Sequence, residues 1–183
     1  MRGGMAMRYV LLLRGVNVGG RNKVGMPELK QKLEDFGFRN TYTYLNSGNV
    51  LTDFDGLRDE AAFRVRKTLI ASYDFDIPFA LLTAEMLSKD LRSVPSWWSE
   101  PFARRDALFP VEGTDFDAIK ADVASLPLGD EIIHFGEHVI LWSKRDEKTY
   151  GRTAYHRLLV QKTYYRNLTI RNGNTFDTLC QRL

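Results

Sequence analysis

Residues 40–54 read NTYTYLNSGNVLTDF, and this stretch decides the fold because it contains two strands and the turn between them. Threonine and tyrosine alternate over Asn40–Leu45, which predicts one strand, and Asn49–Phe54 predicts another. Asn46-Ser47-Gly48 is a turn signal, since asparagine and glycine readily adopt positive φ and serine bonds nearby backbone groups. The stretch therefore predicts an antiparallel hairpin.

The segments on either side extend the hairpin into a β-α-β-β-α-β unit. The apolar run Arg8–Arg14 predicts the first strand, and Ile77–Leu82 predicts the fourth. A helix is expected over Pro27–Phe36, with proline in its first turn and Gly37 after its end. A second helix is expected after Gly56.

The second half of the chain repeats this order after a short helix and a proline-bounded segment. Its expected elements are a strand over Arg105–Val111, a helix over Phe116–Leu126, strands over Glu131–Phe135 and His138–Trp142, a helix over Thr149–Thr163, a strand over Asn167–Arg171 and a helix over Thr175–Leu183. We expect an α+β fold, with a tandem pair of ferredoxin-like halves, a short helical connector and a C-terminal helix. The expected parts are a flexible leader (1–7), a first half (8–83), a connector (84–104) and a second half (105–183).

Composition places the chain among ordered proteins without a membrane span. Of its 183 residues, 44% are hydrophobic, which argues against global disorder. The longest apolar runs have about five residues, against about 20 for a span. The first seven residues have no apolar segment long enough for a secretory signal, so none is expected. Cys180 is the only cysteine, so an intramolecular disulfide is excluded and a cytoplasmic location is expected.

Positive charge is concentrated in two segments without an acidic residue, 8–27 and 148–176. They carry ten positive charges together, so the rest of the chain has a net charge of −7 against +3 for the whole. Such blocks are typical of proteins that bind phosphate or other anions, and also of ordinary solvated basic faces.

The loop after the first strand, LRGVNVGGRNK (13–23), combines glycines with basic residues and precedes a helix. Glycine lets backbone N–H groups approach a ligand, and a helix N-terminus favours an anion. The loop lacks the dinucleotide pattern, and Met26-Pro27 stands where a P-loop needs Lys-Ser/Thr. It is therefore interpreted as a generic anion nest or as a turn rich in glycine for conformational reasons alone.

The predicted topology gives this loop a neighbour. The loop and the hairpin turn leave the same end of the sheet, and the first and third strands are adjacent. The candidate ligand-binding residues are Arg14, Arg21 and Lys23 for charge, Gly15, Gly19 and Gly20 for backbone approach, Asn17, Asn46, Ser47 and Asn49 for orientation, and Arg171 and Asn172 from the C-terminal segment. The first strand is apolar on both faces, so helices should cover one face and either the companion half or a second subunit the other.

Other chemistry-bearing residues give weaker signals. His134, His138 and Glu137 lack a third firm ligand for zinc, and no residue that would activate Cys180 is visible. We therefore expect neither a metal nor a cofactor, and no catalytic set is recognised. The third strand has too few aromatic residues for RNA binding on the sheet face. Asn174 or Thr175 is the expected N-cap of the last helix, with Asp177 in its first turn.

Three motifs carry a resemblance to a known family. LLRGVNVGG (12–20), YLNSGNV (44–50) and TIRNGNT (169–175) resemble the bacterial family called domain of unknown function 1697. The resemblance implies two ferredoxin-like halves and no established activity. Gly173 departs from the family pattern, because a tryptophan is common at that position.

These observations lead to one hypothesis and two alternatives. The hypothesis is a protein that binds an anionic ligand, such as a phosphorylated molecule, a nucleotide or a nucleic-acid backbone, through the glycine-rich basic loop. The alternatives are an enzyme acting on a small anionic substrate and an interaction protein without a ligand. The sequence predicts no membrane association and leaves the oligomeric state and any catalysis open.

Overall fold

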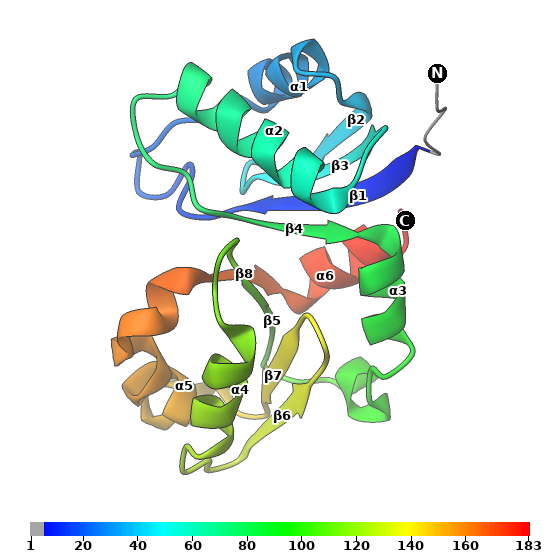
Figure 1. Ribbon diagram of the computed structural model, residues 1–183. Helices are drawn as coiled ribbons and strands as arrows, with labels where there is room; N and C mark the ends of the chain where they lie inside the picture. Colours follow the sequence, from blue (N-terminus) through cyan, green and yellow to red (C-terminus); the bar gives the residue numbers. More distant parts are fainter. Residues whose placement is uncertain (1–5) are drawn as a thin grey trace. The chain divides into compact units, whose positions relative to one another are not determined.

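The first half of the protein is a four-stranded antiparallel sheet with two helices on one face (Figure 1). The computed structural model describes residues 6–183. The elements are β1 (Met7–Leu13), α1 (Met26–Asp35), β2 (Arg39–Tyr44), β3 (Asn49–Phe54), α2 (Arg58–Ser72) and β4 (Phe79–Thr83), and the strand order is β2-β3-β1-β4. Of the expected leader, residues 1–5 lie outside the described residues, and Met7 already belongs to β1.

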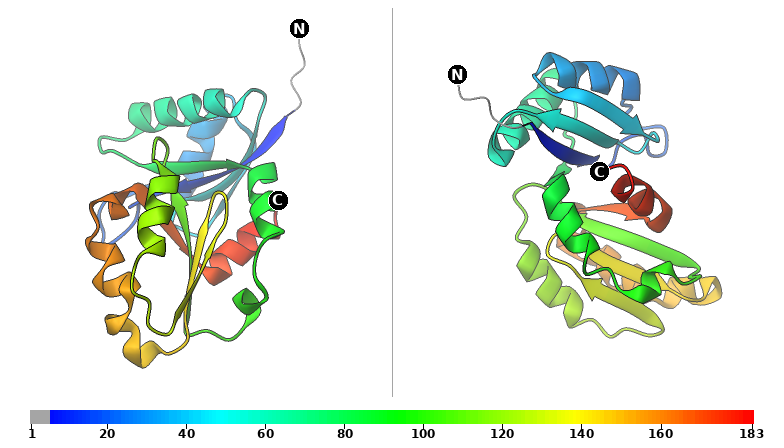
Figure 2. Two further views of the ribbon diagram at one scale, coloured as in Figure 1. Left: turned by 60° about the horizontal axis from the view of Figure 1, so that its bottom comes forward. Right: turned by 90° about the vertical axis from the view of Figure 1, so that its right-hand side faces the viewer.

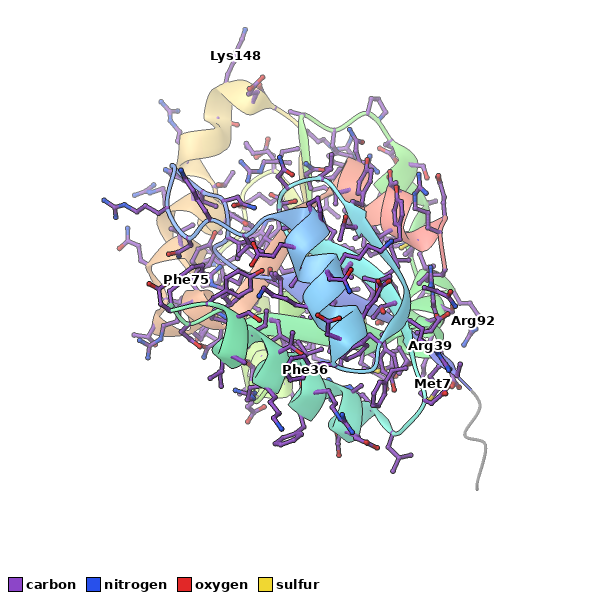
Figure 3. All side chains as sticks on the ribbon, turned by 90° about the horizontal axis from the view of Figure 1, so that it is seen from above. Met7, Phe36, Arg39, Phe75, Arg92 and Lys148 are labelled. Carbon is purple, nitrogen blue, oxygen red and sulfur yellow. The ribbon has the colours of Figure 1, made fainter. Side chains whose placement is uncertain are left out.

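The apolar strand β1 lies at the centre of this sheet. It pairs antiparallel with β3 and with β4, and Val10 stands opposite Leu51 on one side and Leu82 on the other. Tyr9, Leu11 and Leu13 point to the other face, where they form the core with residues of α1 and α2. Figure 3 shows the two helices side by side over this face and labels Phe36, the C-cap residue of α1. Alternation along β1 thus separates a helix-covered face from a second apolar face.

The second half contains a second four-stranded antiparallel sheet, with the order β6-β7-β5-β8. Its elements are α3 (Ala84–Leu91), η1 (Ser96–Ser99), β5 (Arg104–Pro110), α4 (Phe116–Ala124), β6 (Glu131–Phe135), β7 (Ile140–Lys144), η2 (Glu147–Arg152), α5 (Ala154–Arg157), η3 (Leu159–Gln161), η4 (Thr163–Asn167), β8 (Leu168–Asn172) and α6 (Gly173–Cys180). The fold is therefore mixed α+β, and the two sheets are consistent with tandem halves. Among residues 6–183, no helix combines the length and hydrophobicity needed to cross a membrane.

Both faces of the second sheet are covered. Leu108 of β5 packs in a cluster with Ile119 and Val123 of α4, whereas its neighbour Phe109 contacts Phe176 of α6. Since successive strand residues point to opposite faces, α4 and α6 lie on opposite sides of the sheet (Figure 2). The closing helix thus contributes a second layer to this half.

The chain divides into two compact units, one ending at Glu85 and the other spanning Met86–Arg182. Helix α3, expected in a connector, is anchored in the second unit. The buried Asp90 carboxylate accepts hydrogen bonds from the backbone N–H groups of Glu137 (2.6 Å) and His138 (3.0 Å). These bonds hold the turn between β6 and β7, and they explain why β7 begins at Ile140 and not at His138 as expected.

The prediction of a single helix over Thr149–Thr163 is wrong. The segment contains the short helices η2, α5 and η3, and η4 begins at its end. Thr153 interrupts it, because its hydroxyl accepts a hydrogen bond from the His156 N–H (3.0 Å) and caps a new helix. The buried Glu131 carboxylate accepts the next two backbone N–H groups, of Ala154 (2.7 Å) and Tyr155 (3.1 Å). A long-range contact therefore sets the start of α5.

Candidate functional site

The glycine-rich loop folds back on itself as a small hairpin. Val18 and Arg21 form an antiparallel bridge, and the Arg21 N–H donates to the Val18 carbonyl (3.1 Å). Between them Gly19 and Gly20 both have positive φ, 57° and 74°, as a two-residue type I′ turn requires. Conformation alone therefore accounts for both glycines, which lie exposed at the tip.

Asn17 fastens the base of this loop. Its side-chain amide donates to the Val24 carbonyl (2.9 Å) and to the Asn46 carbonyl (2.7 Å), and its Oδ1 accepts the Val24 N–H (2.9 Å). Asn22 adds a bond from its Nδ2 to the Gly15 carbonyl (3.1 Å). Asn17 is thus a structural cross-link. To orient a ligand, as expected from the sequence, its side chain would have to give up hydrogen bonds to Val24 or Asn46.

The predicted proximity of the loop and the hairpin turn is confirmed. The Leu13 N–H donates to the Gly48 carbonyl (2.8 Å), and the bond from Asn17 to Asn46 joins the loop to the turn. Gly48 has a φ of 76°, and a Cβ there would lie 2.6 Å from that of Leu13. A side chain at this position would therefore separate the two segments.

The remaining residues of the turn differ in exposure. Asn49 is fully buried, and its amide donates to the Tyr44 carbonyl and to the Ser47 hydroxyl, both at 2.9 Å. Ser47 and Asn46 are exposed. The composite surface therefore presents Asn46 and Ser47 to solvent, while the side chain of Asn49 stabilises the turn from inside.

Three basic residues belong to this surface. Arg14 is half-buried, and its backbone N–H donates to the Pro78 carbonyl (2.8 Å). Arg21 and Lys23 are exposed, and neither pairs with a carboxylate within residues 6–183. The loop therefore carries positive charge that the described part of the first half does not neutralise.

The C-terminal candidates have structural roles in the second half. Arg171 is 6% exposed and donates to the Thr169 hydroxyl (2.9 Å) and the Ile170 carbonyl (2.8 Å). Its burial lowers the pKa of the guanidinium to about 10. Asn172 caps α6, because its Oδ1 accepts the Thr175 N–H (2.9 Å). The prediction of an N-cap at Asn174 or Thr175 is therefore wrong. Asp177, expected in the first turn of α6, lies beyond it.

The departure at Gly173 has a local explanation. A Cβ on Gly173 would lie 2.8 Å from Cβ of Arg105 and 2.9 Å from its guanidinium carbon. Arg105 is held there by Asp177 (3.0 Å) and by the Asn174 Oδ1 (3.1 Å). In this chain, the space beside the start of α6 is therefore filled by an arginine side chain.

The residues weighed for metal or nucleophilic chemistry have other partners. His138 Nδ1 lies 3.0 Å from the Asp90 carboxylate, and His134 Nε2 lies 3.4 Å from the Ser93 hydroxyl. Within residues 6–183, no group of three His, Cys, Asp or Glu side chains is arranged to hold a metal ion. Burial raises the pKa of the Cys180 thiol to about 12, so the thiol stays protonated at neutral pH.

The sequence interpretation missed a polar pocket in the second half, at the start of β5 and the end of β8. The pocket has a volume of about 370 Å³ and is lined by Phe102, Ala103, Arg104, Arg105, Asp106, Asn172, Gly173 and Asn174. The run Arg104-Arg105-Asp106 at the head of an apolar strand was the available signal. Sequence alone does not reveal that this run meets the C-terminal motif across the sheet.

Comparisons with known proteins agree with the fold and the motifs. A family model described as "Protein of unknown function (DUF1697)" matches residues 7–141. The solved structure of the conserved bacterial protein SP0830 from Streptococcus pneumoniae is 41% identical and has a TM-score of 0.92, covering 97% of this chain and 98% of that one. The comparison with curated proteins found no match. The chain therefore belongs to the DUF1697 family of bacterial proteins of unknown function.

Proposed function

We propose that this protein binds a phosphate-bearing ligand on the surface formed by the loop 14–23 and the turn 46–49. The observation that carries the proposal is the presence of two exposed cations, Arg21 and Lys23, without a carboxylate partner in the described residues, on a loop fixed at its base. A charged ligand would replace water around these side chains and would not have to displace an internal ion pair.

The internal bonds of the loop support this proposal. Asn17 and Asn22 hold the loop closed through their side chains, and the turn at Gly19-Gly20 fixes the tip. A loop that is ordered before binding loses little conformational entropy when a ligand arrives. Arg14, Arg21 and Lys23 would supply charge, Gly15, Gly19 and Gly20 the backbone approach, and Asn46 and Ser47 polar contacts.

The alternative of an interaction protein without a ligand is also supported by specific contacts. The side chains of Asn17 and Asn49 satisfy backbone groups, and glycine at positions 19 and 20 follows from the turn type. This alternative explains the motif residues but assigns no role to the exposed charges. We favour ligand binding for that reason.

We extend the proposal to the fold and the location. The order β2-β3-β1-β4, with α1 after the first strand and α2 after the third, supports a ferredoxin-like description of the first half. The order β6-β7-β5-β8 supports the same description of the second. The single cysteine supports a cytoplasmic location.

The test compares two double variants that each remove two positive charges from the first half. Arg21→Gln/Lys23→Gln changes the loop, and Lys30→Gln/Lys67→Gln changes exposed residues on α1 and α2. The probe is a fluorescent single-stranded oligonucleotide, measured by anisotropy over a salt series. We expect the loop variant alone to lower the slope of log affinity against log salt by about 1.4, because each phosphate contact contributes about 0.7.

An equal decrease of this slope in the two double variants would mean that net charge, and not this surface, attracts the oligonucleotide. Absence of binding at low salt would exclude the nucleic-acid version. A thermal-shift series with ATP and with inorganic phosphate then tests small ligands, since a ligand selective for the folded state raises its stability. No shift with either compound, together with no oligonucleotide binding, would contradict the proposed function.

A further inference from the structure

The basic segment 148–176 of the second half contains cations that the proposed function does not use. Lys162 pairs with Asp122 (2.8 Å), and Arg171 is buried. Four other cations of the segment are exposed and have no carboxylate partner within residues 6–183: Lys148, Arg152, Arg157 and Arg166. Positive charge that the described residues do not neutralise is therefore present in this half too.

Two of these arginines line one pocket beside α5. The pocket has a volume of about 260 Å³ and is lined by Pro127, Arg152, Thr153, Ala154, Arg157 and Leu158. None of the described residues in this lining is acidic. Pockets for drug-sized ligands begin at about 300 Å³, so this one fits a small molecule.

The backbone that carries the two arginines is held in place. The Thr153 hydroxyl accepts the His156 N–H (3.0 Å), and the Arg157 N–H donates to the Thr153 carbonyl (2.9 Å). The buried carboxylate of Glu131, on β6, accepts the first two N–H groups of α5. This part of the pocket is therefore ordered before a ligand arrives, which lowers the entropy lost on binding.

The positive charge of the pocket comes from the arginine side chains and not from the end of α5, because the first N–H groups of the helix are already bonded. A guanidinium presents its N–H donors in one plane and can pair with two oxygens of one phosphate. Arg152 and Arg157 together carry two positive charges. A phosphate monoester, with a charge between about −1.5 and −2 at pH 7, matches them.

The lining also has an apolar part. Pro127, Ala154 and Leu158 contribute to it, and Leu158 is 37% exposed. A ligand that covers this leucine would remove apolar surface from water, which favours binding. The pocket therefore suits a molecule with a charged end and an apolar substituent.

We propose that this pocket binds a small phosphate monoester with an apolar substituent. Arg152 and Arg157 pair with the phosphate, and Pro127 and Leu158 contact the substituent. The pocket lies in the second half and does not depend on the loop 14–23. It is a second ligand site, distinct from the surface of the proposed function.

The test is an amide NMR titration with three probes that separate the two parts of the ligand. Phenyl phosphate has the anion and an apolar ring, inorganic phosphate has only the anion, and phenol lacks the phosphate. We expect phenyl phosphate to shift the amide signals of residues 152–158, and inorganic phosphate to shift the same signals with lower affinity. Phenol at the same concentration should leave them unchanged.

Two double variants separate the pocket from the general charge of the segment. Arg152→Gln/Arg157→Gln should weaken phenyl phosphate at least about tenfold, the effect of losing hydrogen bonds to a charged group. Lys148→Gln/Arg166→Gln removes two exposed cations that are not in the pocket lining and should leave the affinity nearly unchanged. If the first double variant does not give a native spectrum, Arg152→Gln alone replaces it and should weaken both phosphates.

A third variant tests the apolar part. Leu158→Ala should weaken phenyl phosphate about threefold, because the ring then buries less apolar surface, and should leave inorganic phosphate unchanged. An equal effect on the two probes, or none on phenyl phosphate, would refute the apolar contact.

Other results would overturn the site itself. One is the absence of shifts in residues 152–158 with phenyl phosphate, and another is a response to phenol as strong as that to phenyl phosphate. Equal weakening in the two double variants would show that the segment acts only as a charged face. Shifts confined to residues 14–23 would support the proposed function and refute this pocket, so the two proposals fail separately.

Discussion

Single asparagine side chains carry much of the local structure of this protein. Asn17 joins the loop to the hairpin turn, Asn49 holds the turn from inside, and Asn172 caps α6. From the sequence, each was equally suited to bind a ligand, because an amide serves either purpose. The three-dimensional partners distinguish the two roles, and they leave Arg21 and Lys23 as the exposed charged candidates of the loop.

Asp106 is the residue for which pH gives the clearest prediction. Burial raises the pKa of its carboxyl above the ordinary value of 3.8, so the folded state holds the proton more tightly than the unfolded state. The stability of the protein should therefore fall, through this group, as pH rises from about 4 through the raised pKa. Asp106→Asn removes this dependence, so the variant should gain stability relative to the wild type over that range.

Urea unfolding of the wild type and of Asp106→Asn across this pH range measures the difference in stability. Asp117→Asn is the control, and its expected effect has the opposite sign. Lys120 lowers the pKa of Asp117, so this pair should make the wild type more stable as pH rises, and the variant should lose that gain in stability. Parallel stability curves for the wild type and Asp106→Asn would show that the environment of Asp106 does not differ between the folded and unfolded states.

At the scale of elements, patterns of alternation and turn residues predicted strands well. The hairpin β2–β3, the central strand β1 and the helix α1 follow from residues that are neighbours in the sequence. The segment after β7 was mispredicted because its boundaries depend on Glu131, which lies more than twenty positions before the backbone groups that it binds. A local pattern cannot contain that information.

Glu131 gives a prediction for this element. Its carboxylate accepts hydrogen bonds from Trp142 Nε1 (2.9 Å) and from two backbone N–H groups at the start of α5. Glu131→Ala would leave three buried donors without an acceptor, and we expect a loss of about 3 kcal/mol in the free energy of unfolding. Urea unfolding measures it, and the exposed Glu147→Ala is the control. A loss below about 1 kcal/mol would contradict this role.

On the scale of the whole molecule, two halves with the same strand order are the main feature. The buried cluster around Leu11 and Leu33 uses residues of the first half only, and the cluster around Leu108 and Trp142 uses residues of the second. Each half therefore closes a hydrophobic core of its own beneath its helices.

These separate cores predict that damage to one half spares the other. Leu33→Ala removes a fully buried side chain from α1 and should cost about 2 to 5 kcal/mol in the first half. All three tryptophans, Trp97, Trp98 and Trp142, lie in the second half, so their fluorescence reports that half alone. We expect hydrogen exchange to accelerate in β1 and α1 with little change in the urea midpoint of fluorescence. If the loss of stability measured by hydrogen exchange in the first half is matched by an equal loss measured by tryptophan fluorescence in the second, the halves unfold as one unit.

The sequence by itself determined the strands, most helices, the family and the neighbourhood of the loop and the hairpin turn, because alternation, turn residues and motifs are local properties. Tertiary structure decided what each polar group does. It closed the loop with Asn17, bound the first N–H groups of α5 to Glu131 and buried Asp106 beside Arg104. These contacts join residues far apart in the chain, and burial, which fixes their energies and the pKa of Asp106, exists only after folding.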